Sequence, residues 1–83
     1  MMDINQWMIK NKYAKNEFNA HHIFVGLDLA HEPRFWVRVK RVMLYRRWRT
    51  SGIYNTTADC YEAAIRGERP AELVLAAPEE VKA

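Results

Sequence analysis

The sequence predicts a small α+β domain, in which an antiparallel sheet of two or three strands packs on one face against an N-terminal and a C-terminal helix. Three observations favour this class: a capped amphipathic segment near the start, alternating apolar and polar residues in the middle, and a sharply bounded helical segment after residue 56. The length of 83 residues corresponds to one domain. We place this domain at residues 1–77 and expect residues 78–83 to form a flexible acidic tail.

A short helix is expected close to the N-terminus. Ile4, Trp7 and Met8 have the i, i+3, i+4 spacing of one helical face, and Asp3 is suited to cap the first turn. The polar stretch at residues 11–16 then ends the helix.

The sheet is expected across residues 21–55. Residues 20–29 form its first strand, because Phe24 and the β-branched residues near it favour extended structure. Within that strand, Gly26 indicates either a bulge or a close approach of another segment to the backbone. Residues 30–33 end in a proline and are typical of a turn, so the chain reverses there.

The second strand is expected at residues 34–39, where apolar and polar side chains alternate. The alternation changes register after Val39, and a β-bulge at Lys40-Arg41 would restore it. A helix over residues 34–48 is the alternative. On a helical wheel of about 100° per residue, however, the apolar and basic residues lie all around the circumference, and this favours the strand.

The most clearly bounded element is a helix at about residues 57–66. Thr56 or Thr57 can cap its start, and Gly67 can terminate it. Because the cap and the terminator are both local signals, we expect this helix independently of how the sheet forms.

Two shorter segments complete the predicted fold. Ile53-Tyr54 follows a turn signal and could open a third short strand. Beyond Pro70, residues 71–77 are compatible with another short helix, and residues 73–75 with an edge strand.

The charge of the chain is concentrated in one segment. Residues 33–58 contain seven basic side chains and no acidic one, whereas the flanking segments each carry a small excess of acids. Such segregation favours an anionic partner. The candidate binding residues are the basic and tryptophan side chains of this segment: Arg34, Trp36, Arg38, Lys40, Arg41, Arg46, Arg47, Trp48 and Arg49.

Two functions are compatible with this basic and aromatic segment. The first is a non-catalytic nucleic-acid-binding or transcription-regulatory accessory protein, whose basic side chains contact phosphates while Trp36 or Trp48 stacks on a base or wedges between bases. The alternative is a small inhibitor or corepressor that binds an acidic patch on a larger protein. A homodimer would also bury some of the many aromatic rings. The simplest reading is a solvated sheet face whose charge prevents aggregation.

Other functional classes find little support in the sequence. The three histidines and the single cysteine, Cys60, lack the paired close spacing of a metal site, so we expect neither a metal nor a cofactor. The three glycines are too far apart for a phosphate loop, and no catalytic constellation is recognisable, so we do not expect an enzyme. Without a long apolar run or paired cysteines, we expect no membrane association and a cytoplasmic location.

Overall fold

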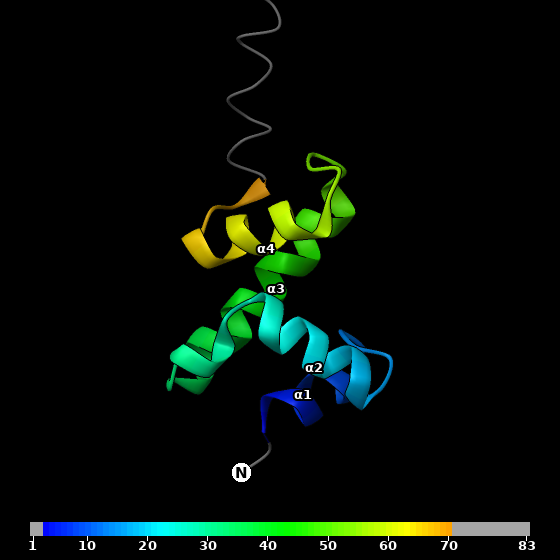
Figure 1. Ribbon diagram of the computed structural model, residues 1–83, viewed down its shortest axis with the longest axis vertical. Coiled ribbons are helices and arrows are strands. Elements are labelled where there is room, and N and C mark those ends of the chain that lie inside the picture. Colours follow the sequence, from blue (N-terminus) through cyan, green and yellow to red (C-terminus); the bar gives the residue numbers. More distant parts are fainter. Residues whose placement is uncertain (1–2, 71–83) are drawn as a thin grey trace, which may run out of the picture.

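The structure is a computed structural model that describes residues 3–70, and these residues are helical throughout their regular elements. The chain forms α1 (Ile4–Lys10), α2 (Glu17–Gly26), the short 3₁₀ helix η1 (Leu29–His31), α3 (Phe35–Ser51) and α4 (Thr57–Arg66) (Figure 1). The described part contains no strand. The α+β prediction with an antiparallel sheet is therefore wrong, and the domain is an all-helical one.

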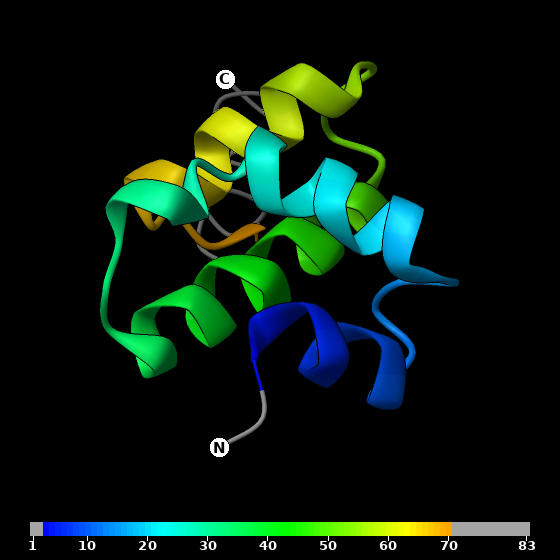
Figure 2. The same ribbon diagram turned by 60° about the horizontal axis from the view of Figure 1, so that its bottom comes forward.

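The longest helix, α3, is the centre of the fold. Figure 1 shows α4 beside the C-terminal half of α3 and α1 at the other end of the molecule, and Figure 2 shows α2 extending toward α4, which its last turn approaches at Gly26. Accordingly, α3 packs against both α4 and α1, and α1 packs against α2. The largest fully buried side chains are contributed by nearly all elements: Trp48, Met8, Leu27, Leu29, Val42 and Cys60.

The packing of α3 explains why its sequence resembles a strand. Val39, Val42, Leu44 and Trp48 are all buried, although the first two lie more than about 120° around the helix axis from the last two. A helix that is covered from one side shows one apolar stripe, but a helix that packs on two sides does not. The scattered wheel thus reflects burial on two sides. Residues 34–39 do not form a strand, and no bulge exists at residues 40–41.

The first predicted strand is also a helix. In α2 the side chain of Asn16 caps the first turn by accepting a hydrogen bond from the Asn19 N–H at 2.8 Å. Gly26, in its last turn, makes a close approach, because a Cβ atom there would overlap the ring of Tyr61 on α4. The close approach of the backbone at this glycine is confirmed, but its cause is helix packing and not pairing of strands.

The two helices with strong local signals are confirmed. The carboxylate of Asp3 accepts a hydrogen bond from the Gln6 N–H at 2.8 Å and caps α1. The hydroxyl of Thr56 caps α4 by accepting from the Asp59 N–H at 3.2 Å, and Gly67 ends α4 with a φ of +79°.

The remaining predictions concern shorter segments. Ile53-Tyr54 lies in the connection between α3 and α4 and forms no strand. The elements expected at residues 71–77 and the tail at residues 78–83 lie outside the described residues. No helix within residues 3–70 is both long enough and apolar enough to cross a membrane.

Candidate binding surface

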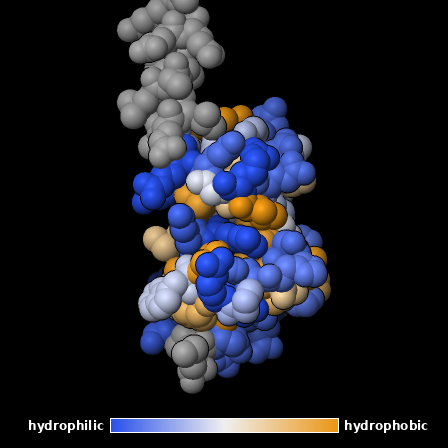
Figure 3. Space-filling view, turned by 90° about the vertical axis from the view of Figure 1, so that its left-hand side faces the viewer, coloured by the Kyte–Doolittle hydropathy of each residue, from blue (hydrophilic) through white to orange (hydrophobic). Residues whose placement is uncertain are grey.

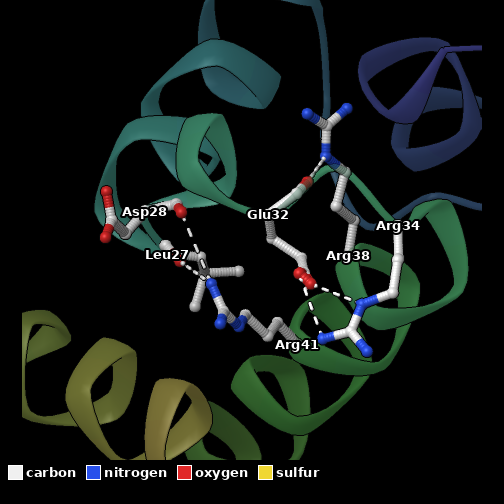
Figure 4. A network of polar contacts seen from close by, with 6 residues as sticks. All are labelled: Leu27, Asp28, Glu32, Arg34, Arg38 and Arg41. Carbon is white, nitrogen blue, oxygen red and sulfur yellow. Dashed lines mark hydrogen bonds and ion pairs between the residues drawn. The ribbon is translucent and has the colours of Figure 1, made fainter.

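Three of the predicted binding residues fasten the loop between α2 and α3 (Figure 4). Arg34 Nε lies 2.9 Å from the carboxylate of Glu32, whose exposed fraction is only 5%. This hydrogen bond, together with the negative charge of Glu32, raises the pKa of Arg34. Arg38 Nε donates to the backbone carbonyl of Glu32, and Arg41 Nη1 donates to the carbonyls of Leu27 and Asp28 at 3.3 and 3.4 Å. The guanidinium groups of Arg38 and Arg41 thus pair with backbone oxygens of the loop, of which the Asp28 carbonyl also accepts from the His31 N–H.

Two further arginines hold more distant segments in place. Arg46 Nη1 donates to the carbonyl of Lys12 at 3.0 Å, and its guanidinium carbon lies 5.5 Å from the centre of the Tyr13 ring. Arg49 Nη1 donates to the hydroxyl of Thr57 at 2.7 Å. Arg46 therefore connects α3 to the loop after α1, and Arg49 connects it to the start of α4.

Trp48 belongs to the core. Its exposed fraction is 0%, its indole N–H donates to the carbonyl of Glu68 at 2.9 Å, and its ring packs against Tyr54 with centroids 4.9 Å apart. A tryptophan in this position has no surface with which to stack on a base. Of the two tryptophans expected to contact a partner, only Trp36 lies on the surface, with an exposed fraction of 77%.

The other two predicted basic residues, Lys40 and Arg47, line a groove of about 400 Å³ along α3. Their side chains make no hydrogen bond or ion pair with another residue of the 3–70 region. Most of the groove's described lining residues belong to α3: Trp36, Lys40, Met43 and Arg47 are exposed, whereas Val39 and Leu44 are buried. The remaining one, Arg69, follows α4. We call this groove the α3 groove.

The α3 groove combines an apolar floor with positive charge. Lys40, Arg47 and Arg69 are cationic, and no carboxylate is present among the described lining residues. Figure 3 shows a similar alternation on one face of the molecule, where hydrophobic surface is exposed between hydrophilic side chains. An apolar surface with a cationic rim offers both burial of apolar area and pairing with anions.

Sequence reasoning missed part of this groove. Met43 was not selected because it is neither basic nor a tryptophan, and Arg69 lies far along the chain, in a segment of net negative charge. One signal could have identified the stripe: Trp36, Lys40, Met43 and Arg47 follow one another at intervals of four, three and four residues, which place them on one side of a helix. That signal has meaning only once the segment is known to be helical.

The groups that could support chemistry lie apart from one another. Cys60 is buried, and burial raises the pKa of its thiol; Arg49 opposes this effect and Asp59 adds to it. His21 and His22 are exposed on α2. Within residues 3–70, no group of three or more histidine, cysteine, aspartate or glutamate side chains is placed to hold a metal ion.

Comparisons with known proteins add no family to these observations. No protein-family model matches the chain, and neither a curated protein nor a solved structure matches it.

Proposed function

We propose that this protein is a non-catalytic accessory protein that binds an acidic, amphipathic helix of a larger protein in the α3 groove. The observation that carries the proposal is Trp36, which is 77% exposed beside a groove with an apolar floor and three cations. Tryptophan and arginine are the residues most enriched at the energetic centres of protein interfaces. An exposed tryptophan of this kind is costly in water and becomes favourable when a partner covers it.

The spacing of the exposed stripe favours a helical partner. Intervals of four, three and four residues are those of the seam along which two helices pack side by side. In this stripe, large apolar side chains (Trp36 and Met43) alternate with cations (Lys40 and Arg47). A partner helix with apolar residues facing the former and carboxylates facing the latter would complement both kinds of position.

The arrangement of the seven basic residues supports a protein partner over a nucleic acid. A phosphate backbone requires cations that follow its path over one face. Here Arg34, Arg38 and Arg41 contact the loop before α3, while Arg46 and Arg49 contact the loop after α1 and the start of α4. The cations are thus distributed around α3 and do not form the single row that an extended strand would give.

A set of synthetic peptides tests the proposal. Each has 17 residues, the length of α3. The first carries leucine and phenylalanine on one helical face and glutamate beside them; the second replaces every glutamate with lysine; the third has the composition of the first in an order that destroys the apolar face. Binding is measured by calorimetry and by the NMR signal of the Trp36 indole N–H. We expect the first peptide to bind at least about tenfold more tightly than the other two.

Substitutions in the groove provide the controls. Trp36→Ala should weaken binding of the first peptide by about 30-fold, the size of an interface hot spot. Phe18→Ala is the matched control, because Phe18 is an aromatic residue on α2 with an exposed fraction of 84% that does not line the groove. The double variant Lys40→Glu/Arg47→Glu should reverse the preference toward the lysine peptide. Equal binding of the three peptides, or an unchanged affinity in Trp36→Ala, would show that the groove is not the binding surface.

Nucleic-acid binding and self-association are measured alongside. Labelled DNA and RNA oligonucleotides are titrated at about 50 and 200 mM salt, where binding to several phosphates would weaken steeply. Micromolar oligonucleotide binding with that salt dependence, and none of the acidic peptide, would replace the proposal with the nucleic-acid hypothesis. Light scattering over a range of concentrations shows whether Trp36 is instead covered by a second copy.

A further inference from the structure

A second groove contains cations and lies at a different place on α3. It has a volume of about 420 Å³ and is bounded by the loop after α1, by α2 and by the C-terminal half of α3. Its described lining residues include three cations, Lys15, Arg46 and Arg49, and no carboxylate. None of its described lining residues belongs to the α3 groove. We call it the Arg46–Arg49 groove.

Hydrogen bonds orient the two arginine side chains and fix the backbone at Lys15. Arg46 is held by its hydrogen bond to the Lys12 carbonyl, and Arg49 by its hydrogen bond to Thr57. The backbone N–H of Lys15 donates to the side chain of Asn19 at 3.1 Å, which fixes the loop immediately before α2. A guanidinium has five N–H donors, so one hydrogen bond orients each arginine and leaves most of its donors for a ligand.

The electrostatics of the groove favour an anion. Arg46 and Arg49 are three residues apart on one helix, so their side chains are neighbours and repel each other. Lys15 adds a third positive charge from the loop between α1 and α2. Elsewhere the protein pairs such charges directly, as Glu32 does for Arg34 and Glu68 for Arg66. No described carboxylate does so here, and a bound anion would relieve the repulsion.

The neutral lining residues define the ligand further. The hydroxyl of Tyr45 and the amide of Asn19 add uncharged hydrogen-bonding groups, and Ile23 contributes an apolar wall. The hydroxyl of Thr50 is already in use, because it donates to carbonyls of its own helix. The volume exceeds what a lone phosphate ion fills and lies within the range of sites for small organic molecules. We infer that the Arg46–Arg49 groove binds the phosphate group of a small phosphorylated metabolite, with the guanidinium groups pairing with its oxygens. This site is independent of the proposed protein-binding function.

NMR titration of the full-length protein tests this inference. The probes are sodium phosphate, glycerol phosphate and adenosine 5′-monophosphate, each compared with sodium chloride at equal ionic strength. We expect saturable shifts at the amides of Lys15, Asn19 and Thr50 and at the side-chain N–H groups of the two arginines. Tighter binding of one organic phosphate than of inorganic phosphate identifies the type of molecule. Equal affinity for all three probes would reduce the site to a phosphate subsite and overturn the inference of a metabolite.

Variants of exposed lysines separate specific binding from general attraction. Lys15→Gln should weaken phosphate binding by about fivefold without unfolding the protein, because the side chain of Lys15 is exposed. Lys10→Gln is the matched control, because Lys10 is an exposed lysine at the end of α1 outside the groove. Shifts that chloride reproduces, or equal weakening in the two variants, would overturn the inference. A ten-nucleotide DNA that binds with a steep salt dependence, while adenosine monophosphate does not bind, would assign the groove to nucleic acid instead.

Discussion

Trp36 and Trp48 lie on the same helix and have opposite environments. Trp36 is 77% exposed beside the α3 groove, whereas Trp48 is fully buried and donates a hydrogen bond to the segment after α4. Both are large aromatic residues within the same basic segment. The presence of a tryptophan in the sequence does not show whether its side chain is buried or exposed. The helices that pack around it determine whether it stabilises the fold or is available to a partner.

The basic residues divide in the same way. Arg41 reaches the carbonyls of Leu27 and Asp28 and secures the loop before α3. Arg47, on the exposed side of α3, lines the groove and makes no side-chain hydrogen bond within residues 3–70. A high local charge therefore contains two populations, one structural and one exposed. The number of charges in a segment therefore does not show which of its side chains hold the fold together.

The largest expected effect separates the two tryptophans. Trp48→Ala should lower the free energy of unfolding by about 3–5 kcal/mol, because it removes a fully buried indole and leaves a cavity. Trp36→Ala should change it by less than about 0.5 kcal/mol, because the side chain is exposed. Urea denaturation followed by circular dichroism measures both.

A domain of this size has a small total stability, so Trp48→Ala can leave the protein largely unfolded. Trp48→Phe then provides the measurement, because it keeps most of the apolar surface and removes the hydrogen bond to Glu68. We expect a loss of about 1–3 kcal/mol for the unpaired carbonyl and the reduced packing. Similar losses for substitutions at Trp36 and Trp48 would contradict the division into a core and an exposed tryptophan.

The parts of the fold that could be predicted from sequence are those with local determinants. Asp3, Thr56 and Gly67 mark helix boundaries through contacts with residues close in sequence, so α1 and α4 were identified with nearly correct limits. In α3, by contrast, the apolar residues lie on two sides because other helices cover both. Periodicity cannot reveal a helix of this kind, since its apolar pattern records the tertiary arrangement rather than one buried face.

The residues that line the α3 groove were only partly predictable from the sequence. The basic segment at residues 33–58 includes Lys40 and Arg47, which line the α3 groove. It gives no indication that Arg46 contacts the carbonyl of Lys12 or that Arg49 contacts Thr57. Backbone carbonyls occur at every residue, and which of them an arginine reaches is decided by helix packing. Arg69 also lines the α3 groove, but it lies beyond α4 in the sequence. Its proximity to α3 could not be inferred before the fold was known.

A smaller effect should distinguish the two populations of arginines. Arg41→Met keeps much of the apolar stem but removes the donor to the Leu27 carbonyl, whereas the Asp28 carbonyl keeps its hydrogen bond from the His31 N–H, so we expect a loss of about 1 kcal/mol of unfolding free energy. Arg47→Met is the matched substitution on the exposed side and should change stability by less than about 0.5 kcal/mol. Thermal and urea unfolding of the two variants in parallel provide the comparison. Equal losses would mean that Arg47 is also structural.

The smallest expected effect is a dependence of stability on alkaline pH that arises from Cys60, which is buried, and Tyr61, which is half-buried, on α4. Burial raises the pKa of the Cys60 thiol, and burial against the stacked ring of Tyr45 raises the pKa of Tyr61.

In the unfolded chain these groups lose their protons near pH 8.5 and 10. Above each value the folded protein holds more protons than the unfolded chain, so the free energy of unfolding should fall as the pH rises. Urea denaturation at about pH 7.5, 9.5 and 10.5 measures this decline.

Cys60→Ala should remove the part of the decline that begins near pH 8.5, and Tyr61→Phe the part that begins near pH 10. Lys40→Gln, on the exposed side, should leave both parts in place. A decline that persists unchanged in Cys60→Ala and Tyr61→Phe would mean that the alkaline sensitivity comes from groups other than these two residues of α4.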